Sequence, residues 1–158
     1  MRGKRAPKRV ISPDEIYQSR LVTKMINRTM RQGKKSVAQK HVYQAFALVE
    51  KETKKNPLEV FHLALENIKP KMEVRPRRVG GASYQVPIPV RGERRESLAI
   101  RWLIRAAQSR PNKDYHHFYE KLAVEIIDAA KKEGRAVAKK EEVRKIAEAN
   151  KAFAHFRW

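Results

Sequence analysis

Side chains able to carry out acid–base or metal chemistry are few in this sequence. His116 and Glu120 stand four residues apart, a spacing that brings two ligands to one helix face, but no third ligand accompanies them and the chain has no cysteine. His117 is no better placed. The remaining histidines are interpreted as structural side chains at the edge of a core: His41, His62 and His155. These residues do not predict a metal site.

Nucleotide-binding loops and catalytic pairs are missing as well. Lys34 follows Gly33 as in a phosphate-binding loop, but the glycine expected four to five residues earlier is absent. The sequence also contains no Gly-rich dinucleotide fingerprint and no paired carboxylates. We therefore predict that the protein is not an enzyme and needs no cofactor.

Arginines and aromatic residues do gather in one stretch, residues 72–105. Arginine forks bind phosphates, and aromatic rings stack on unpaired bases. Tyr84, Trp102 and residues 156–158 are candidates for stacking, although Trp102 fits a core position better because it shares an apolar helical stripe with Leu103. The arginines of the stretch are Arg75, Arg77, Arg78, Arg91, Arg94, Arg95, Arg101 and Arg105.

Two glycines within this stretch predict a β-hairpin. Gly80 and Gly81 can take the positive φ angles of a tight turn, and runs that favour extended structure flank them. Pro87 and Pro89 share parity, so both missing N–H groups can face the outer edge of a two-stranded ribbon. We therefore expect an isolated antiparallel arm at about residues 72–91. Its tip would consist of Gly80, Gly81, Ser83 and Tyr84.

The arm leads into a helix with two different faces. Apolar residues recur at helical spacing from Ser97 onward, while three arginines at intervals of seven and four residues line another stripe: Arg94, Arg101 and Arg105. Because an isolated hairpin is marginally stable in water, a basic hairpin beside a basic helix is expected to lie against a polyanion. A solvated ribbon whose arginines only keep the protein soluble is the plainer alternative.

Net charge indicates the same class of partner. The 158 residues include 37 Lys and Arg against 17 Asp and Glu, a formal charge of +20 that repels itself unless a polyanion neutralises it. Nucleic acid is the first candidate and an anionic membrane surface the second. No apolar run approaches the ~20 residues that span a bilayer, and the N-terminus lacks an apolar signal segment. We expect a cytoplasmic protein with no membrane partner and no disulfides.

A single domain with a basic tail is the expected organisation. Residues 1–11 contain no acid and little that could be buried, so they are predicted to be a disordered tail that orders on its partner. Residues 12–158 hold enough apolar residues for one helical core. The tail's basic residues include Lys4, Arg5, Lys8 and Arg9.

Capping signals set the expected helix boundaries. Gly33 is expected to end the first helix, which leaves Lys34 and Lys35 in the following turn, and Gly134 to close a later helix. Expected N-caps are Ser12 or Ser19 for the first helix, then Ser36, Asn56 and Asp114. The last helix is expected to bury Val143, Ile146 and Ala147.

Several segments together resemble the bacterial form of the small-subunit ribosomal protein S7 family. The resemblance extends over essentially the whole chain. It rests on residues 33–36 (GKKS), 64–70 (ALENIKP), 77–81 (RRVGG), 84–87 (YQVP), 94–95 (RR), 99–102 (AIRW) and 147–155 (AEANKAFAH). His41 departs from the family pattern, which prefers an apolar residue there, and this concerns local packing only.

The resemblance implies a mainly α-helical domain of about six helices, with the ribbon between the third and fourth. It also implies direct binding to small-subunit ribosomal RNA, nucleation of the head (the 3′ major domain), and a place at the subunit interface near exit-site tRNA and mRNA. Small-subunit proteins nine and eleven are the implied neighbours, and the arm tip would face tRNA. Transferred by position, the RNA-facing residues are Lys4, Arg5, Lys8, Arg9, Lys34, Lys35, Arg75, Arg77, Arg78, Arg94, Arg95 and Arg101.

A DNA-bending architectural protein is the alternative from another class, because a basic β-arm on a helical body can also grip the minor groove. Such proteins usually need two arms and an apolar wedge at the tip. Here the tip reads Gly-Gly-Ala-Ser, and nothing in the sequence suggests an obligate dimer. Competition between folded ribosomal RNA and duplex DNA at one salt concentration would separate the two hypotheses.

Overall fold

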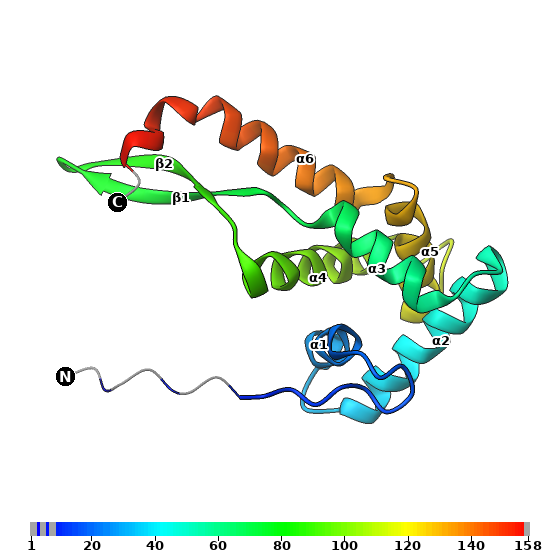
Figure 1. Ribbon diagram of the computed structural model, residues 1–158. Coiled ribbons are helices and arrows are strands. Elements are labelled where there is room, and N and C mark those ends of the chain that lie inside the picture. The colour runs from blue at the N-terminus through cyan, green and yellow to red at the C-terminus, as the bar shows by residue number, and fades with distance from the viewer. Residues whose placement is uncertain (1–2, 4–5, 7–8, 157–158) are drawn as a thin grey trace.

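The computed structural model describes residues 3, 6 and 9–156. Figure 1 shows a body of helices from which a two-stranded ribbon extends, with the sixth helix beside it. In chain order the elements are α1 (Arg20–Thr29), α2 (Lys35–Thr53), α3 (Pro57–Ile68), β1 (Met72–Val79), β2 (Ala82–Pro89), α4 (Gly92–Gln108), α5 (Phe118–Ala130), α6 (Gly134–Ala149) and the 3₁₀ helix η1 (Lys151–Phe156). The predicted fold class is confirmed: a mainly α-helical chain with an antiparallel hairpin between α3 and α4.

The core forms where the apolar stripes of α2, α3, α4 and α5 meet. Phe46 and Phe61 are fully buried, and their ring centroids lie 5.4 Å apart. Burying a side chain of this size contributes about 1.5–3 kcal/mol. Leu103 anchors α4 in the same core, and Trp102 packs against it half-buried, while Arg105 is exposed. The core therefore fixes which face of α4 presents arginines.

Asp14 explains why α1 begins late. Its Oδ2 accepts hydrogen bonds from the backbone N–H groups of Ile16 (3.3 Å) and Tyr17 (3.1 Å), which closes a separate turn. Ser12 is therefore not a helix cap, and α1 starts at Arg20 after Ser19, the second of the two predicted positions.

Two other predicted N-caps are wrong and one is confirmed. Ser36 lies inside α2, because the chain reverses at Gly33 (φ +74°) and the helix already starts at Lys35. Asp114 lies before α5, which begins at Phe118, where Glu120 accepts a hydrogen bond from the backbone N–H of His117 (3.0 Å). Asn56 caps α3 as predicted, its Oδ1 accepting from the N–H of Leu58 at 2.9 Å.

Gly134 opens α6 and does not close α5, which ends at Ala130. Its φ of +86° favours glycine, and a Cβ there would lie 3.0 Å from Oε1 of Glu125. Glu125 is fully buried and accepts hydrogen bonds from Nε of Arg110 (2.8 Å) and from the N–H of Ala136 (2.9 Å). The joint between α5 and α6 is thus built around a buried carboxylate.

The ribbon has the predicted two-residue turn. Gly80 and Gly81 have φ angles of +57° and +88°, and β1 pairs with β2 so that Val79 lies opposite Ala82. Since hydrogen-bonded and non-hydrogen-bonded pairs alternate from that closing pair, the positions at 72, 74 and 76 are of the non-hydrogen-bonded kind. Their partners are Pro89, Pro87 and Gln85, so the prolines, including Pro76 itself, lose no ladder hydrogen bond.

In the described residues the arm is a two-stranded ribbon and not part of a larger sheet, as predicted, but the expectation that it stands alone is wrong. Val86 is completely buried, β1 contacts α6, and β2 contacts both α6 and η1. Tyr84 packs on the rings of Phe153 (5.1 Å between centroids) and Phe156 (5.3 Å). The C-terminal helices therefore support the ribbon along one side, as Figure 1 shows.

Helix α6 is attached through small residues. Ala136 and Ala147 are buried, as predicted for Ala147, but Val143 is only half-buried and Ile146 is 41% exposed, so the prediction that both are buried is wrong. Close approach through alanine leaves the larger side chains of α6 at the surface.

Candidate nucleic-acid interface

Arg101 on α4 lies at the centre of a cluster of positive charges. Burial lowers the pKa of its guanidinium group, and the charges of three neighbouring arginines lower it further. These neighbours are Arg28 at the end of α1 and Arg105 and Arg94 on α4. Among the described residues, nothing accepts a hydrogen bond from the buried Nε of Arg101. The cluster is thus a site where an anion would relieve the repulsion between the arginines.

Arg28 belongs to this cluster but was not predicted from the sequence. It is exposed in the last turn of α1, and Arg20 and Lys24 precede it at intervals of four residues, a helical spacing that could have indicated it. Its proximity to Arg101 depends on how α1 crosses α4, which only the tertiary structure determines. The predicted stripe on α4 itself is present.

Glu73 on β1 holds two of the predicted arginines in place. It accepts hydrogen bonds from Nε of Arg75 (2.6 Å) and Nε of Arg94 (2.7 Å). Burial raises the pKa of Glu73, but the hydrogen bonds from Arg94 and Arg75 outweigh it and leave the pKa below its ordinary value. Both guanidinium groups remain about half-exposed, so Glu73 orients them across the junction of ribbon and α4 without hiding them.

The other predicted arginines of the arm have different surroundings. Arg95 is half-buried and its Nε donates to the carbonyl of Pro70 (3.1 Å), which ties the start of α4 to the base of the ribbon. Arg77, Arg78 and Arg91 are exposed. Arg95 therefore has a structural contact, whereas the other three face outward.

At the tip of the ribbon, Gly80, Gly81 and Ser83 are exposed, but Tyr84 is not an open stacking platform. Its half-buried ring packs on Phe153 and Phe156, so the aromatic residues from the hairpin and the C-terminal segment form one intramolecular cluster. The tip that projects beyond this cluster is small and uncharged.

Two further groups of basic residues lie along the N-terminal half. Lys34 and Lys35 are exposed at the start of α2. Arg9 and Arg28 line a groove of about 490 Å³ together with Lys24 and Ile100, so the end of the predicted tail lies along α1 and α4. The predicted tail residues Lys4, Arg5 and Lys8 lie outside the described residues.

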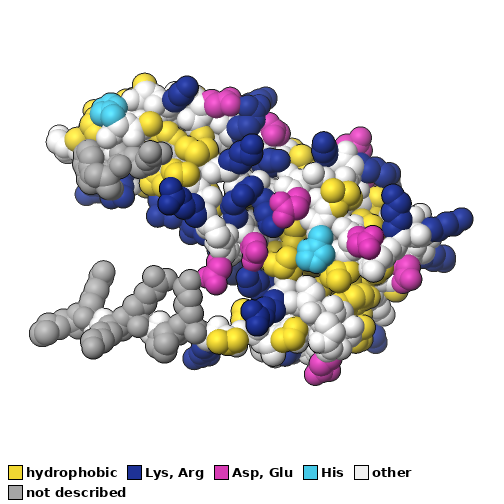
Figure 2. All heavy atoms as spheres, in the orientation of Figure 1, with side chains coloured by type: hydrophobic (Ala, Val, Ile, Leu, Met, Phe, Trp, Pro, Cys, Tyr) yellow, Lys and Arg dark blue, Asp and Glu magenta, His cyan; other side chains and the backbone are white. Residues whose placement is uncertain are grey.

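Figure 2 shows the resulting surface: Lys and Arg side chains gather where the ribbon meets the helical body, beside a hollow in the outline. Within the described part of the chain, no three His, Cys, Asp or Glu side chains are grouped so that they could hold a metal ion. The helices of that part include none that is both long and apolar enough to cross a membrane. The chemistry of this surface is that of guanidinium and ammonium groups facing an anion.

Comparison with known proteins identifies the family. The family model described as "Ribosomal protein S7p/S5e" matches residues 1–151. The chain belongs to this family. S7 proteins are structural and non-enzymatic constituents of the small ribosomal subunit. As a member of this family, the chain is an RNA-binding structural constituent of the small subunit of the cytoplasmic ribosome.

Individual relatives agree with this assignment over all or nearly all of their length. "Small ribosomal subunit protein uS7" of Carboxydothermus hydrogenoformans is 58% identical over 152 residues, which cover 96% of each chain. The protein of the same name from Thermotoga maritima is 55% identical over 158 residues, 100% of each chain. The one from Lactococcus lactis subsp. cremoris is 54% identical over the same extent.

Proposed function

We propose that this S7 protein binds small-subunit ribosomal RNA directly and nucleates assembly of the head, the 3′ major domain. The arginine cluster around Arg101 carries the proposal, because its guanidinium group and those of Arg28, Arg94 and Arg105 lie close enough to repel one another. A phosphate is the anion that planar arginine forks match best. Family membership favours ribosomal RNA over duplex DNA as its source.

The RNA-facing residues of this proposal are Lys4, Arg5, Lys8, Arg9, Lys34, Lys35, Arg75, Arg77, Arg78, Arg91, Arg94, Arg95, Arg101 and Arg105. Arg28 is added because it lies with Arg101. The helical core holds these groups in fixed mutual positions, so RNA helices that bind them would be fixed in one orientation. The protein acts as a scaffold, and no bond is made or broken.

The ribbon tip is proposed to lie near exit-site tRNA and mRNA, at the subunit interface, with small-subunit proteins nine and eleven as neighbours. The exposed tip of Gly80, Gly81 and Ser83 supports this role, since it can approach a second RNA closely without a side chain in the way. The basic surface behind the tip would remain on ribosomal RNA.

Shortening the ribbon tests whether its tip acts on exit-site tRNA while the basic surface behind it binds ribosomal RNA. Residues 78–83 are removed, and Arg77 is joined to Tyr84 through Asn-Gly. Arg77 and Tyr84 face each other in the register and form the same kind of pair as Val79 and Ala82, so the turn type is kept. The cluster of Tyr84 with Phe153 and Phe156 also stays intact.

Small subunits reconstituted with this shortened protein are expected to assemble and to hold exit-site tRNA less tightly. The matched control replaces Gly80-Gly81 with Asn-Gly in the full-length ribbon and should behave as the natural protein. Failure of assembly with the shortened ribbon, together with normal assembly of an Arg101→Met protein, would show that the roles are reversed.

A further inference from the structure

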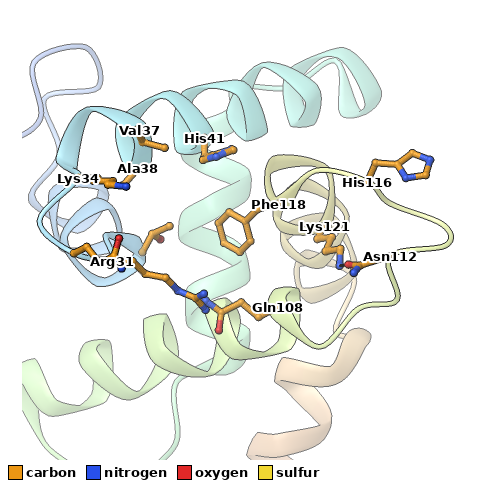
Figure 3. Close-up of a pocket in the computed structure, with 12 residues that line it drawn as sticks. Arg31, Lys34, Val37, Ala38, His41, Gln108, Asn112, His116, Phe118 and Lys121 are labelled. Atoms are coloured by element: carbon orange, nitrogen blue, oxygen red, sulfur yellow. Dashed lines mark hydrogen bonds between the residues drawn. The ribbon is translucent and has the colours of Figure 1, made fainter.

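A second basic site lies beside the turn between α1 and α2. It is a cavity of about 450 Å³, within the range of roughly 300–1,000 Å³ typical of small-ligand sites. Figure 3 shows Val37, Ala38 and His41 of α2 on one side, Gln108 of α4 opposite, and Phe118 of α5 between them. With Thr29 at the end of α1, the cavity therefore has walls from four helices that the core holds together.

The described residues make its lining cationic. Arg31, Lys34 and Lys121 contribute positive charge, and no Asp or Glu is among the described residues that line it. Lys121 is only 6% exposed, and its Nζ donates to two uncharged groups, the carbonyl of Arg110 (2.7 Å) and Oδ1 of Asn112. No ion pair joins Lys121 to a carboxylate within the described residues. A nearly buried ammonium group with no counter-charge favours an anion in the space beside it.

Two polar atoms of the wall are buried without a hydrogen-bond partner among the described residues: Oγ1 of Thr29 and Nδ1 of His41. Both atoms lie beneath the surface that a water molecule reaches, so a ligand would meet them only after their side chains move. The amide of Gln108 adds a donor and an acceptor, while Phe118 and Val37 provide apolar surface. The His41 and Phe118 rings meet edge to face at 6.0 Å.

We propose that this cavity binds one unpaired nucleotide of the ribosomal RNA. Its base would lie on the apolar wall, with the exposed amide of Gln108 hydrogen-bonded to the base edge, and its phosphate would lie near Lys34 and Arg31. A phosphate alone would use only the cations, whereas a nucleotide uses the charged, polar and apolar parts together. Proteins commonly read RNA through such splayed-out bases, held by stacking and by contacts to their edges.

This inference rests on the proposed binding to ribosomal RNA, and a variant that fills the cavity separates the two. Val37 lines the cavity and is 50% exposed, so Val37→Trp can occupy the space without disturbing the core. Leu63→Trp is the matched control, since Leu63 is 53% exposed on α3 and does not line the cavity. Circular dichroism establishes that both variants fold.

Equilibrium binding and base-specific chemical probing are carried out on small-subunit ribosomal RNA with each full-length protein. Val37→Trp is expected to weaken binding about tenfold, the scale of one lost base contact, and to expose one unpaired base that the natural protein protects. The Leu63→Trp protein should keep both the affinity and the protection. The four free nucleoside monophosphates are titrated separately.

A charge variant provides a second test that does not depend on filling the cavity. Lys34→Gln should lower the slope of log affinity against log salt by about 0.7–0.9, the contribution of one phosphate, and weaken protection of the same base. Lys40→Gln is its control, because Lys40 is exposed on the same helix and does not line the cavity.

The outcomes are distinguishable. Unchanged affinity and protection with Val37→Trp would overturn the nucleotide site while ribosomal RNA binding stands. Failure of the natural protein to bind the RNA would instead overturn the proposed function. Tight binding of a free mononucleotide, with no RNA base protected at the cavity, would assign the cavity to a small molecule and also overturn this inference.

Discussion

Replacing Arg101 with methionine should separate stability from binding. Methionine keeps the length and the helix preference of the side chain but removes its charge and its N–H groups. In the free protein that charge lies among three other arginines, and its buried Nε has no acceptor among the described residues. Arg101→Met should therefore stabilise the free protein while it weakens the complex with RNA.

The size of each effect follows from the surroundings of Arg101. A like-charge contact at a protein surface costs about 0.2–0.5 kcal/mol. Relief from three such contacts therefore increases the free energy of unfolding by about 1 kcal/mol in total. For a domain of this length, that raises the melting temperature by about 2–4 °C. Loss of a charge-assisted hydrogen bond to phosphate costs about 1.5–3 kcal/mol, or roughly 10- to 150-fold in affinity.

Thermal denaturation tests the predicted gain in stability, and RNA-binding measurements at a series of salt concentrations test the predicted loss of affinity. The slope of log affinity against log salt should fall by about 0.7–0.9 for one lost phosphate contact. Arg144→Met is the control, because Arg144 is paired with Glu141 (2.8 Å) and Glu148 (2.6 Å) on α6. That variant should gain no stability and keep its RNA affinity. A lower melting temperature with unchanged affinity in Arg101→Met would refute the reasoning.

Two further predictions concern residues that hold the scaffold together. Gly134→Ala should lower the melting temperature, because alanine at φ +86° costs about 1–2 kcal/mol and its Cβ would meet Oε1 of Glu125 at 3.0 Å. Thermal denaturation measures this loss. An unchanged melting temperature would contradict the prediction. Glu73→Gln should destabilise the protein at neutral pH by about 1 kcal/mol. Because the folded-state pKa of Glu73 is below the ordinary 4.5, its contribution is complete above that value and is lost as the pH falls through the folded-state pKa. Denaturant titrations from pH 7 to pH 3 should show the two proteins converging in acid, and a difference independent of pH would argue against the ion pairs.

The ribbon could be predicted because its signals are local. Gly80 and Gly81 occupy the turn, and Pro87 and Pro89 fit only positions without a ladder hydrogen bond. Its support by the C-terminal helices could not be predicted, since α6 offers mainly alanines to its contacts and Ile146 points to solvent. The sequence of α6 therefore lacks the apolar periodicity that would have indicated packing against the ribbon.

The predictions of helix caps and helix ends were wrong where a polar side chain has a partner that is far away in the sequence. Asp14 closes a turn and accepts a hydrogen bond from the hydroxyl of Tyr43 (2.9 Å), a contact across the fold that no local motif indicates. Gly134 looks like a helix-closing glycine, but the buried carboxylate of Glu125 determines its place at the start of α6.

The candidate site could also be predicted only in part. The arginine stripe on α4 follows from its spacing, whereas Arg28 joins it only through the crossing of α1 and α4. The cavity beside His41 combines residues of four helices, so no single stretch of sequence contains its pattern.

Competition between folded small-subunit ribosomal RNA and duplex DNA of equal length tests the central claim most directly. The natural protein is titrated with both at several salt concentrations. The ribosomal RNA should be preferred at every concentration, with an affinity that falls steeply with salt because several phosphates are contacted. Equal affinity for the two polymers, or an RNA affinity that hardly changes with salt, would contradict the assignment of this basic surface to ribosomal RNA.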